Sequence, residues 1–184
     1  MNKLLLLFTQ DGLQFQLNKG RSTVEEGAFF VTEETPAQYI EQKLAELLSE
    51  KSYGEIITLS ALNHFTMMPA GFSIHDMGYQ LIGYNAAVDR TKEELMLSVN
   101  KKYDLQFYYA FPKAYYSQIK SQNKPTFFNF SGEKFLSSLH PKNGKEIHIN
   151  LYHNQCEFFA IDRKKVILYN NLDVNSEVDF LYFV

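Results

Sequence analysis

The first residues that could do chemistry are His153 and Cys156, which stand close together near the C-terminal end of the chain. An imidazole beside a thiol is the arrangement that activates a cysteine nucleophile. The two residues flank an expected hairpin turn, where side chains close in sequence need not meet. Cys156 also begins an apolar run, which favours a small buried side chain over a nucleophile.

The remaining histidines do not have the spacing of a metal site. None of the 5 histidines belongs to an HExxH motif or to a paired Cys/His motif. His75 and Asp76 could form an acid–base pair, but adjacent residues on a helix do not face each other. His148 stands between Ile147 and Ile149, so it lies on an exposed strand face if those two are buried. We therefore predict no metal ligands and no catalytic histidine.

Pairs of glutamates are a third kind of candidate, because two carboxylates can share acid and base roles. The pairs are Glu25-Glu26, Glu33-Glu34 and Glu93-Glu94. Each falls at the end of an expected strand or the start of an expected helix, and Glu93-Glu94 would lie in a first helical turn, where acids complement the helix dipole. A two-metal nuclease needs several clustered carboxylates, and the expected strands supply almost none.

The elements that position these residues begin with a hairpin. The dipeptide Asp11-Gly12 is a standard hairpin connector, and it separates an apolar run from a stretch in which Leu13, Phe15 and Leu17 alternate with polar residues. Strands are expected over residues 3–9, 13–17, 22–31 and 55–59, with a helix that starts at Thr35-Pro36 between the last two. A hairpin followed by a strand, a crossover helix and a strand predicts an α/β fold with a mixed sheet.

The rest of the chain has weaker patterns. A loop is expected over residues 65–72. Helices are expected over residues 74–84, 92–99, 112–121 and 131–139, the last with Ser131 as its cap. Strands are expected over residues 102–110, 126–130, 146–153, 156–161 and 166–169, and a final helix from residue 176. The end of the chain thus repeats the opening order of hairpin, strand and helix, and this indicates an internal repeat.

Composition narrows the possible partners and the compartment. The formal net charge is −3, without the basic patch that nucleic-acid binding requires. A single cysteine rules out an intramolecular disulfide. The apolar run at residues 4–8 is too short for a signal peptide, and no apolar run has the roughly 18–20 residues of a membrane span. We expect a cytoplasmic protein.

The C-terminal stretch IHINLYHNQCEFFAIDRKKVILYNNLDVNSEVDFLYFV resembles a family of uncharacterised bacterial proteins with an actin-like ATPase fold. The matching positions are Tyr169-Asn170, the run from Asp179 to Tyr182, Met68-Pro69 and the opening hairpin. That fold consists of two ribonuclease-H-like halves. The resemblance implies that residues 1–142 form a first ribonuclease-H-like subdomain with inserted helices, and that residues 143–184 start a second, incomplete one.

The resemblance also implies where a nucleotide would bind. Actin-like ATPases hold the phosphates and Mg²⁺ with two acidic, glycine-containing hairpin turns, so Asp11 and Gly12 are candidates for a phosphate-loop remnant, or else a plain hairpin turn. The second turn, at residues 152–156, has neither Asp nor Gly. We therefore favour a non-catalytic domain without cofactor that binds another protein or forms a homodimer. A nucleotide-binding ATPase that uses ATP and Mg²⁺ is the alternative, and a ribonuclease-H-like nuclease is the weakest one.

Overall fold

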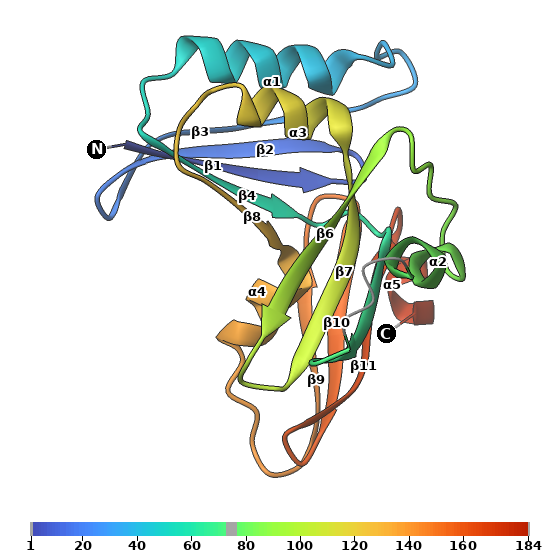
Figure 1. The fold of residues 1–184 in the computed structure, drawn as a ribbon. Coiled ribbons are helices and arrows are strands. Elements are labelled where there is room, and N and C mark those ends of the chain that lie inside the picture. Colours follow the sequence, from blue (N-terminus) through green and yellow to red (C-terminus); the bar gives the residue numbers. More distant parts are fainter. Residues whose placement is uncertain (1, 73–76, 184) are drawn as a thin grey trace.

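The computed structural model describes residues 2–72 and 77–183 of the chain. The chain folds into three sheets and five helices within this described part, and Figure 1 shows their arrangement. The His75-Asp76 pair and the start of the helix expected from residue 74 lie outside the described residues.

The first sheet has five strands in the order β3-β2-β1-β4-β8. The strands are β1 (Asn2–Thr9), β2 (Gly12–Lys19), β3 (Ser22–Phe30), β4 (Glu55–Ser60) and β8 (Thr126–Phe130). Strands β1, β2 and β3 are antiparallel neighbours, whereas β4 runs parallel to β1 and β8 parallel to β4. The mixed sheet expected from the sequence is therefore confirmed.

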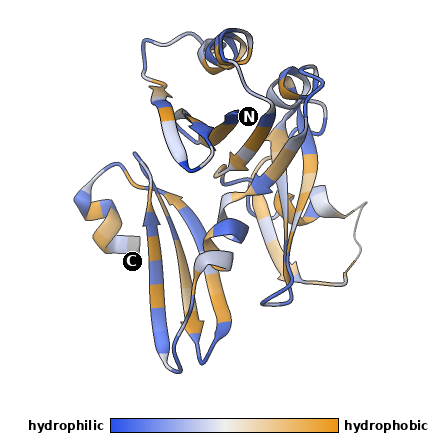
Figure 2. Cartoon of the chain, turned by 90° about the vertical axis from the view of Figure 1, so that its left-hand side faces the viewer, coloured by the Kyte–Doolittle hydropathy of each residue, from blue (hydrophilic) through white to orange (hydrophobic). Residues whose placement is uncertain are grey.

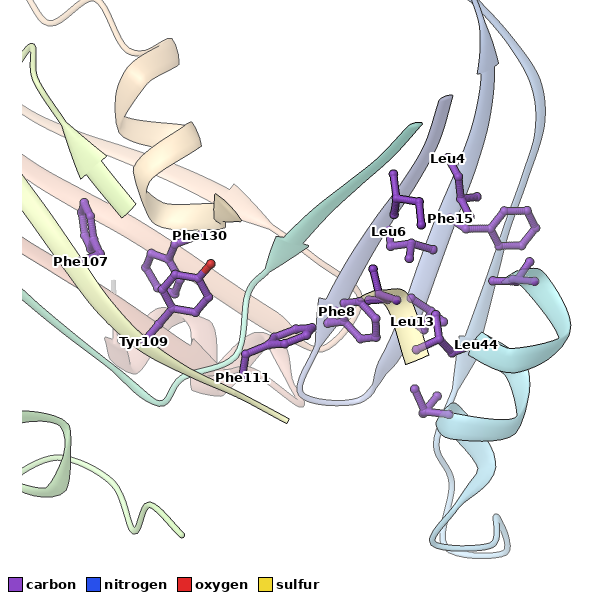
Figure 3. Close-up of a cluster of buried hydrophobic side chains, with 14 of the residues drawn as sticks. Leu4, Leu6, Phe8, Leu13, Phe15, Leu44, Phe107, Tyr109, Phe111 and Phe130 are labelled. Carbon is purple, nitrogen blue, oxygen red and sulfur yellow. The ribbon is translucent and has the colours of Figure 1, made fainter. Parts of the chain in front are cut away.

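Two helices cover one face of this sheet (Figure 1): α1 (Tyr39–Glu50) and α3 (Lys113–Lys120). Alternate residues of β1, namely Leu4, Leu6 and Phe8, point toward the helices and are almost fully buried. Figure 3 shows Leu44 of α1 against this side of the sheet. Helix α1 starts later than expected, because Thr35 does not cap it; the Thr35 hydroxyl instead donates to the carbonyl of Thr32 at 2.6 Å in the preceding turn.

The second sheet is inserted between β4 and β8 and corrects two expectations. Its strands β5 (Phe65–Pro69), β6 (Glu93–Asn100) and β7 (Leu105–Pro112) have the order β5-β7-β6, with the short helix α2 (Gly78–Gly83) between β5 and β6. The loop expected over residues 65–72 and the helix expected over residues 92–99 are both wrong. β7 pairs on both edges, and this pairing holds the two segments extended. The insertion is thus mainly a sheet rather than helices.

The third sheet contains β9 (Lys145–Leu151), β10 (Gln155–Asp162) and β11 (Lys165–Asp173) in the order β11-β10-β9. Helix α4 (Ser131–Ser138) precedes it and α5 (Glu177–Phe183) follows it. Phe130, and not Ser131, occupies the cap position of α4, and the Ser131 hydroxyl donates to Glu157 instead. Figure 2 shows polar and apolar residues alternating along the strands of this sheet.

Aromatic rings join the three sheets into one core. The ring centroid of Phe130, at the end of β8, lies 5.3 Å from that of Phe107 on β7 and 6.0 Å from that of Tyr169 on β11. Phe65 of β5 lies 5.2 Å from Phe130 and 5.0 Å from Tyr169. Such pairs bury large areas in offset and edge-to-face geometries. They fix how the third sheet sits on the other two.

Candidate functional site

The tips of the first and last hairpins meet, and this contact is the candidate site. The turn between β1 and β2 carries Asp11, and the turn between β9 and β10 carries His153. His153 Nδ1 lies 2.8 Å from Asp11 Oδ2. The ring of Phe30, at the end of β3, stacks on the imidazole with centroids 4.0 Å apart. The structure thus confirms that Asp11 lies in a hairpin turn, and it shows that His153, which the sequence analysis weighed as a partner of Cys156, lies against Asp11 instead.

Polar groups of the first turn are bonded to the chain itself. The Thr9 hydroxyl donates to Asp11 Oδ1 at 2.7 Å, so both oxygens of the Asp11 carboxylate have partners. The backbone amide of Gln10 donates to Gln155 Oε1 at 3.2 Å. A backbone amide of a turn is the kind of donor that could face an anion. In this protein the Gln10 amide faces a side chain of the second hairpin.

Gln155 is the centre of a buried polar network between the first and third sheets. Its Nε2 atom donates to the carbonyl of Ala61, just after β4, and to Asn171 Oδ1 at 2.6 Å. Asn171 Nδ2 donates to the same Ala61 carbonyl at 2.8 Å. Gln155 and Asn171 are both buried. Buried amides with several partners fix orientation, because breaking one bond leaves an unsatisfied polar group.

Packing against the neighbouring strand explains why a glycine stands at position 12. A Cβ atom at this position would lie 2.1 Å from the carbonyl oxygen of Phe29 on β3. The space beside Gly12 is therefore filled by the backbone of the neighbouring strand, and β2 and β3 could not pair here with a larger residue. The glycine is required by the sheet, whether or not the turn binds a ligand.

A magnesium nucleotide is the cofactor that the actin-like resemblance implies, and the residues at the hairpin tips do not fit it. The Asp11 carboxylate is hydrogen-bonded to Thr9 and His153, and the Gln10 amide is hydrogen-bonded to Gln155. The space beside Gly12 is occupied by the backbone of β3. Among residues 2–72 and 77–183, no group of three or more His, Cys, Asp or Glu side chains could hold a metal ion.

The electrostatics near Asp11 also disfavour an added anion. Loss of solvent raises the pKa of the Asp173 carboxyl, and the negative charge of Asp11 raises it further. Asp173 lies at the end of β11 and pairs with Gln155 in the third sheet. Two carboxylates therefore already repel each other at this end of the molecule.

A second polar cluster, which sequence reasoning missed, surrounds Glu157. This glutamate on β10 is fully buried. Its carboxylate accepts hydrogen bonds from four side chains: Tyr152, Tyr169, Asn150 and Ser131. Burial and the Glu157 charge raise the pKa values of the Tyr152 and Tyr169 hydroxyls, so both remain protonated donors. The signal in the sequence was a lone acid inside the apolar run of residues 156–161.

The other sequence candidates are not brought together. Cys156 is fully buried, and burial raises the pKa of its thiol, as expected for a small buried side chain rather than a nucleophile. Ile147 and Ile149 are 57% and 39% exposed, so the condition under which His148 would lie on the exposed face of β9 is not met. Glu93 belongs to a strand and not to a helix, and its Oε1 atom lies 2.8 Å from His64 Nδ1.

Comparison with known proteins identifies the fold. A family model described as "Protein of unknown function (DUF3822)" matches residues 1–184. Among curated proteins, none matches the sequence. A protein of Bacteroides thetaiotaomicron, described as having an actin-like ATPase fold and unknown function, superposes with a TM-score of 0.79 at 17% identity, over 99% of this chain and 74% of that one. The chain therefore has the actin-like ATPase fold that the sequence resemblance predicted.

Two further structures are similar. The cytoplasmic domain of EpsL, an inner-membrane component of the type II secretion system of Vibrio cholerae, has a TM-score of 0.55 and 11% identity, over 94% of this chain and 71% of that one. A chain of the PilM–PilN type IV pilus biogenesis complex has a TM-score of 0.53 and 9% identity, over 99% of this chain and 64% of that one. At such identities these likenesses concern the fold alone. In the described part of this chain, no helix is long and apolar enough to cross a membrane.

Proposed function

The chain belongs to this family of proteins of unknown function, and we propose that it is a non-catalytic actin-like domain that binds another protein. The observation that carries the proposal is the direct contact between the two hairpin tips. Where the resemblance would put phosphates and Mg²⁺, His153 bonds to Asp11 at 2.8 Å and Gln155 accepts from the Gln10 amide at 3.2 Å.

The cost of opening this contact supports the proposal. A phosphate group between the turns would have to replace the bond between Asp11 and His153, and a partly exposed pair of this kind contributes about 0.5–1 kcal/mol. It would also bring negative charge close to Asp11 and to Asp173, whose pKa is already raised. Under the proposal, residues 1–142 are the first ribonuclease-H-like half and residues 143–184 the start of the second. The hairpin contact then ties the halves together.

Two similar structures support a protein-binding function. EpsL is a component of a secretion system, and PilM is found in a complex with PilN. The present chain also exposes large apolar side chains on β9 and α5, among them Ile147, Leu151, Val178 and Leu181. Exposed apolar groups of this kind are typical of surfaces that contact other proteins. The net charge of −3 favours a protein partner over nucleic acid.

Calorimetric titration of the purified chain with Mg²⁺-ATP tests the proposal. We expect no saturable heat up to millimolar nucleotide, in the wild type and in Asp11→Ala alike. The control variant is Glu50→Ala, which changes an exposed carboxylate at the C-terminal end of α1. Saturable binding that is lost in Asp11→Ala and kept in Glu50→Ala would overturn the proposal and assign the alternative, a nucleotide-binding ATPase.

A further inference from the structure

The connection between α4 and β9 contains two neighbouring residues that can react with each other. Asn143 is followed by Gly144, and at no other position in the sequence does a glycine follow an asparagine. The backbone nitrogen of a glycine can approach the preceding side-chain carbonyl closely, because glycine has no Cβ to restrict the backbone. Neither residue belongs to a helix or a strand, since α4 ends at Ser138 and β9 begins at Lys145 (Figure 1).

The fold leaves both reacting groups accessible. Asn143 is exposed, and its side chain has no hydrogen-bond partner among residues 2–72 and 77–183. The carbonyl of Gly144 accepts from the Arg163 amide at 2.9 Å, whereas the Gly144 amide makes no backbone hydrogen bond within the described ranges. A side chain without partners moves between its rotamers, so the Asn143 carbonyl carbon can come within reach of this nitrogen.

Another exposed asparagine shows how the fold protects such a residue. Asn85 is exposed as well, and Ala86 follows it. The Ala86 amide, however, donates to the carbonyl of Ile82 at 3.0 Å. An amide that keeps this hydrogen bond does not lose its proton and cannot attack, and the methyl group of the alanine restricts the backbone further. Asn143 and Asn85 therefore differ in the availability of the nitrogen that follows them.

Positive charge surrounds the Asn143-Gly144 pair. Lys142 and Lys145 flank it, and the β10–β11 turn, which contacts it through the backbone, carries basic residues at 163–165. These basic residues outnumber the nearby acids Glu146 and Asp162. The attack begins with loss of a proton from the glycine amide, and positive charge nearby favours the anion that forms. The same charges attract the carboxylate that the reaction produces.

We propose that Asn143 is a site of spontaneous modification, where the side-chain amide is lost and an aspartate or an isoaspartate forms. The Gly144 nitrogen gives its proton to water and bonds to the side-chain carbonyl carbon of Asn143. The carbon–nitrogen bond of the side-chain amide then breaks, and the nitrogen takes up a proton and leaves as ammonia. Water opens the resulting cyclic imide at either of its two carbonyl groups, and the position of opening decides between aspartate and isoaspartate.

The net reaction consumes one water and releases one ammonia, and nothing is oxidised or reduced. It joins two neighbours in the chain and needs neither a cavity nor a partner. The inference therefore goes beyond the proposed protein-binding function and does not depend on it.

The isoaspartate product changes the connection between α4 and the third sheet. Its backbone runs through the former side-chain methylene and is one carbon longer, which shifts the Gly144 carbonyl relative to the Arg163 amide. We expect the start of β9 to separate from the β10–β11 turn in this form. The ordinary aspartate keeps the length of the backbone and adds only one negative charge to the formal net charge of −3.

Storage of the purified chain in mildly alkaline buffer tests the reaction, with proteolysis and mass spectrometry as the measurement. We expect conversion at Asn143 to be about tenfold or more faster than at Asn85, and about tenfold slower in Gly144→Ala than in the wild type, because a Cβ restricts the approach of the nitrogen. Gly144→Ala is a suitable variant because the added Cβ meets nothing within 4 Å, so the fold is kept.

A synthetic peptide with the sequence of residues 139–148 gives the rate without the fold. Conversion at Asn143 in both the peptide and the folded chain supports the proposal. Equal conversion at Asn143 and Asn85, or an intact Asn143 in the folded chain while the peptide converts, would overturn it.

Hydrogen exchange at the Arg163 amide tests the structural consequence. The isoaspartate form is separated from the unmodified chain by chromatography, and the variant Asn143→Asp supplies the charge without the longer backbone. We expect exchange at Arg163 to be about tenfold or more faster in the isoaspartate form and to stay at the wild-type rate in Asn143→Asp, because an amide exchanges when its hydrogen bond opens. Slow exchange in the isoaspartate form, or equally fast exchange in Asn143→Asp, would refute the proposed effect of the longer backbone.

Discussion

His153 Nδ1 lies 2.8 Å from Asp11 Oδ2, although 142 residues separate the two in the sequence. The contact joins the tips of two hairpins that belong to different sheets. The imidazole is also held by the stacked ring of Phe30. The pair therefore couples the first sheet to the third at the place where the actin-like resemblance would put phosphates.

The contribution of this pair to stability is measurable by a double-mutant cycle. The side chain of His153 is 49% exposed and that of Asp11 16% exposed, so solvent screens their attraction. We expect a coupling free energy of about 0.5–1 kcal/mol between Asp11→Asn and His153→Gln. Urea unfolding of the wild type, both single variants and the double variant gives this value. Strict additivity would show that the contact does not stabilise the fold.

Asp173 gives a prediction about pH. Its pKa is raised in the folded protein, first by desolvation and then by Asp11. The folded state thus holds this proton more tightly than the unfolded state, so the stabilising contribution is present below the unfolded pKa and is lost as pH rises through the folded one. Asp173→Asn should therefore raise the free energy of unfolding at pH 7 by less than about 1 kcal/mol, because the side chain is partly exposed.

Unfolding as a function of pH checks the origin of this effect. The difference between wild type and Asp173→Asn should vanish at acidic pH, below the usual pKa range of an aspartate. In an Asp11→Asn background the gain at pH 7 should be smaller. A gain that persists unchanged in strong acid contradicts the electrostatic explanation.

The buried carboxylate of Glu157 predicts a larger effect. Tyr169→Phe removes one of its four donors and leaves a fully buried charge less satisfied. Hydrogen bonds to charged groups contribute about 1.5–3 kcal/mol, and we expect a loss of that size in the free energy of unfolding. Tyr84→Phe, at an 83% exposed position, is the matched control and should change stability by less than about 0.5 kcal/mol. Equal effects in the two variants would mean that Glu157 does not depend on its tyrosine donors.

The elements that sequence reasoning predicted well are those with a local signal. The Asp11-Gly12 connector and the alternation of Leu13, Phe15 and Leu17 are enough to specify a hairpin, and β1 and β2 pair through that turn. The strand expected over residues 126–130 is β8 with the same bounds. The residues of these segments carry the signal themselves, although β8 also pairs with the distant strand β4.

The wrong expectations concern segments whose secondary structure depends on pairing with another strand. Residues 92–99 carry acids at positions 93 and 94 and were expected to form a helix. Leu95, Leu97 and Val99 also alternate, however, and pairing of β6 with β7 makes the segment a strand. The site shows the same limit. Asp11 could be placed in a turn from the sequence, whereas its bond to His153 depends on how the third sheet packs on the first. No local pattern encodes that packing.

Gly12 separates a packing role from a ligand-binding role. A Cβ atom at this position would lie 2.1 Å from the Phe29 carbonyl oxygen, so Gly12→Ala must push β2 and β3 apart. Overpacking of this kind costs about 1–3 kcal/mol. The control is Gly144→Ala, where a Cβ atom would meet nothing within 4 Å. Differential scanning calorimetry should show a lower melting temperature for Gly12→Ala and little change for the control. A fully stable Gly12→Ala would contradict the packing explanation.

The amide of Gln10 reports whether the hairpin tips stay closed in solution. Gln10 is an exposed residue, yet its backbone amide donates to Gln155 Oε1 at 3.2 Å. An amide held in this way exchanges with solvent only when the contact opens.

Gln155→Met keeps the size of the side chain and removes its bonds to Gln10, Ala61 and Asn171. We expect slow exchange of the Gln10 amide in the wild type and faster exchange in Gln155→Met. The variant should also lose about 1–3 kcal/mol of the free energy of unfolding, because the Ala61 carbonyl and the Asn171 side chain each lose a buried partner. Hydrogen exchange followed by NMR measures the first two quantities, and the Gln14 amide of β2 is the internal reference. Rapid exchange at Gln10 in the wild type would mean that the hairpin tips separate in solution, so that a nucleotide could enter between them.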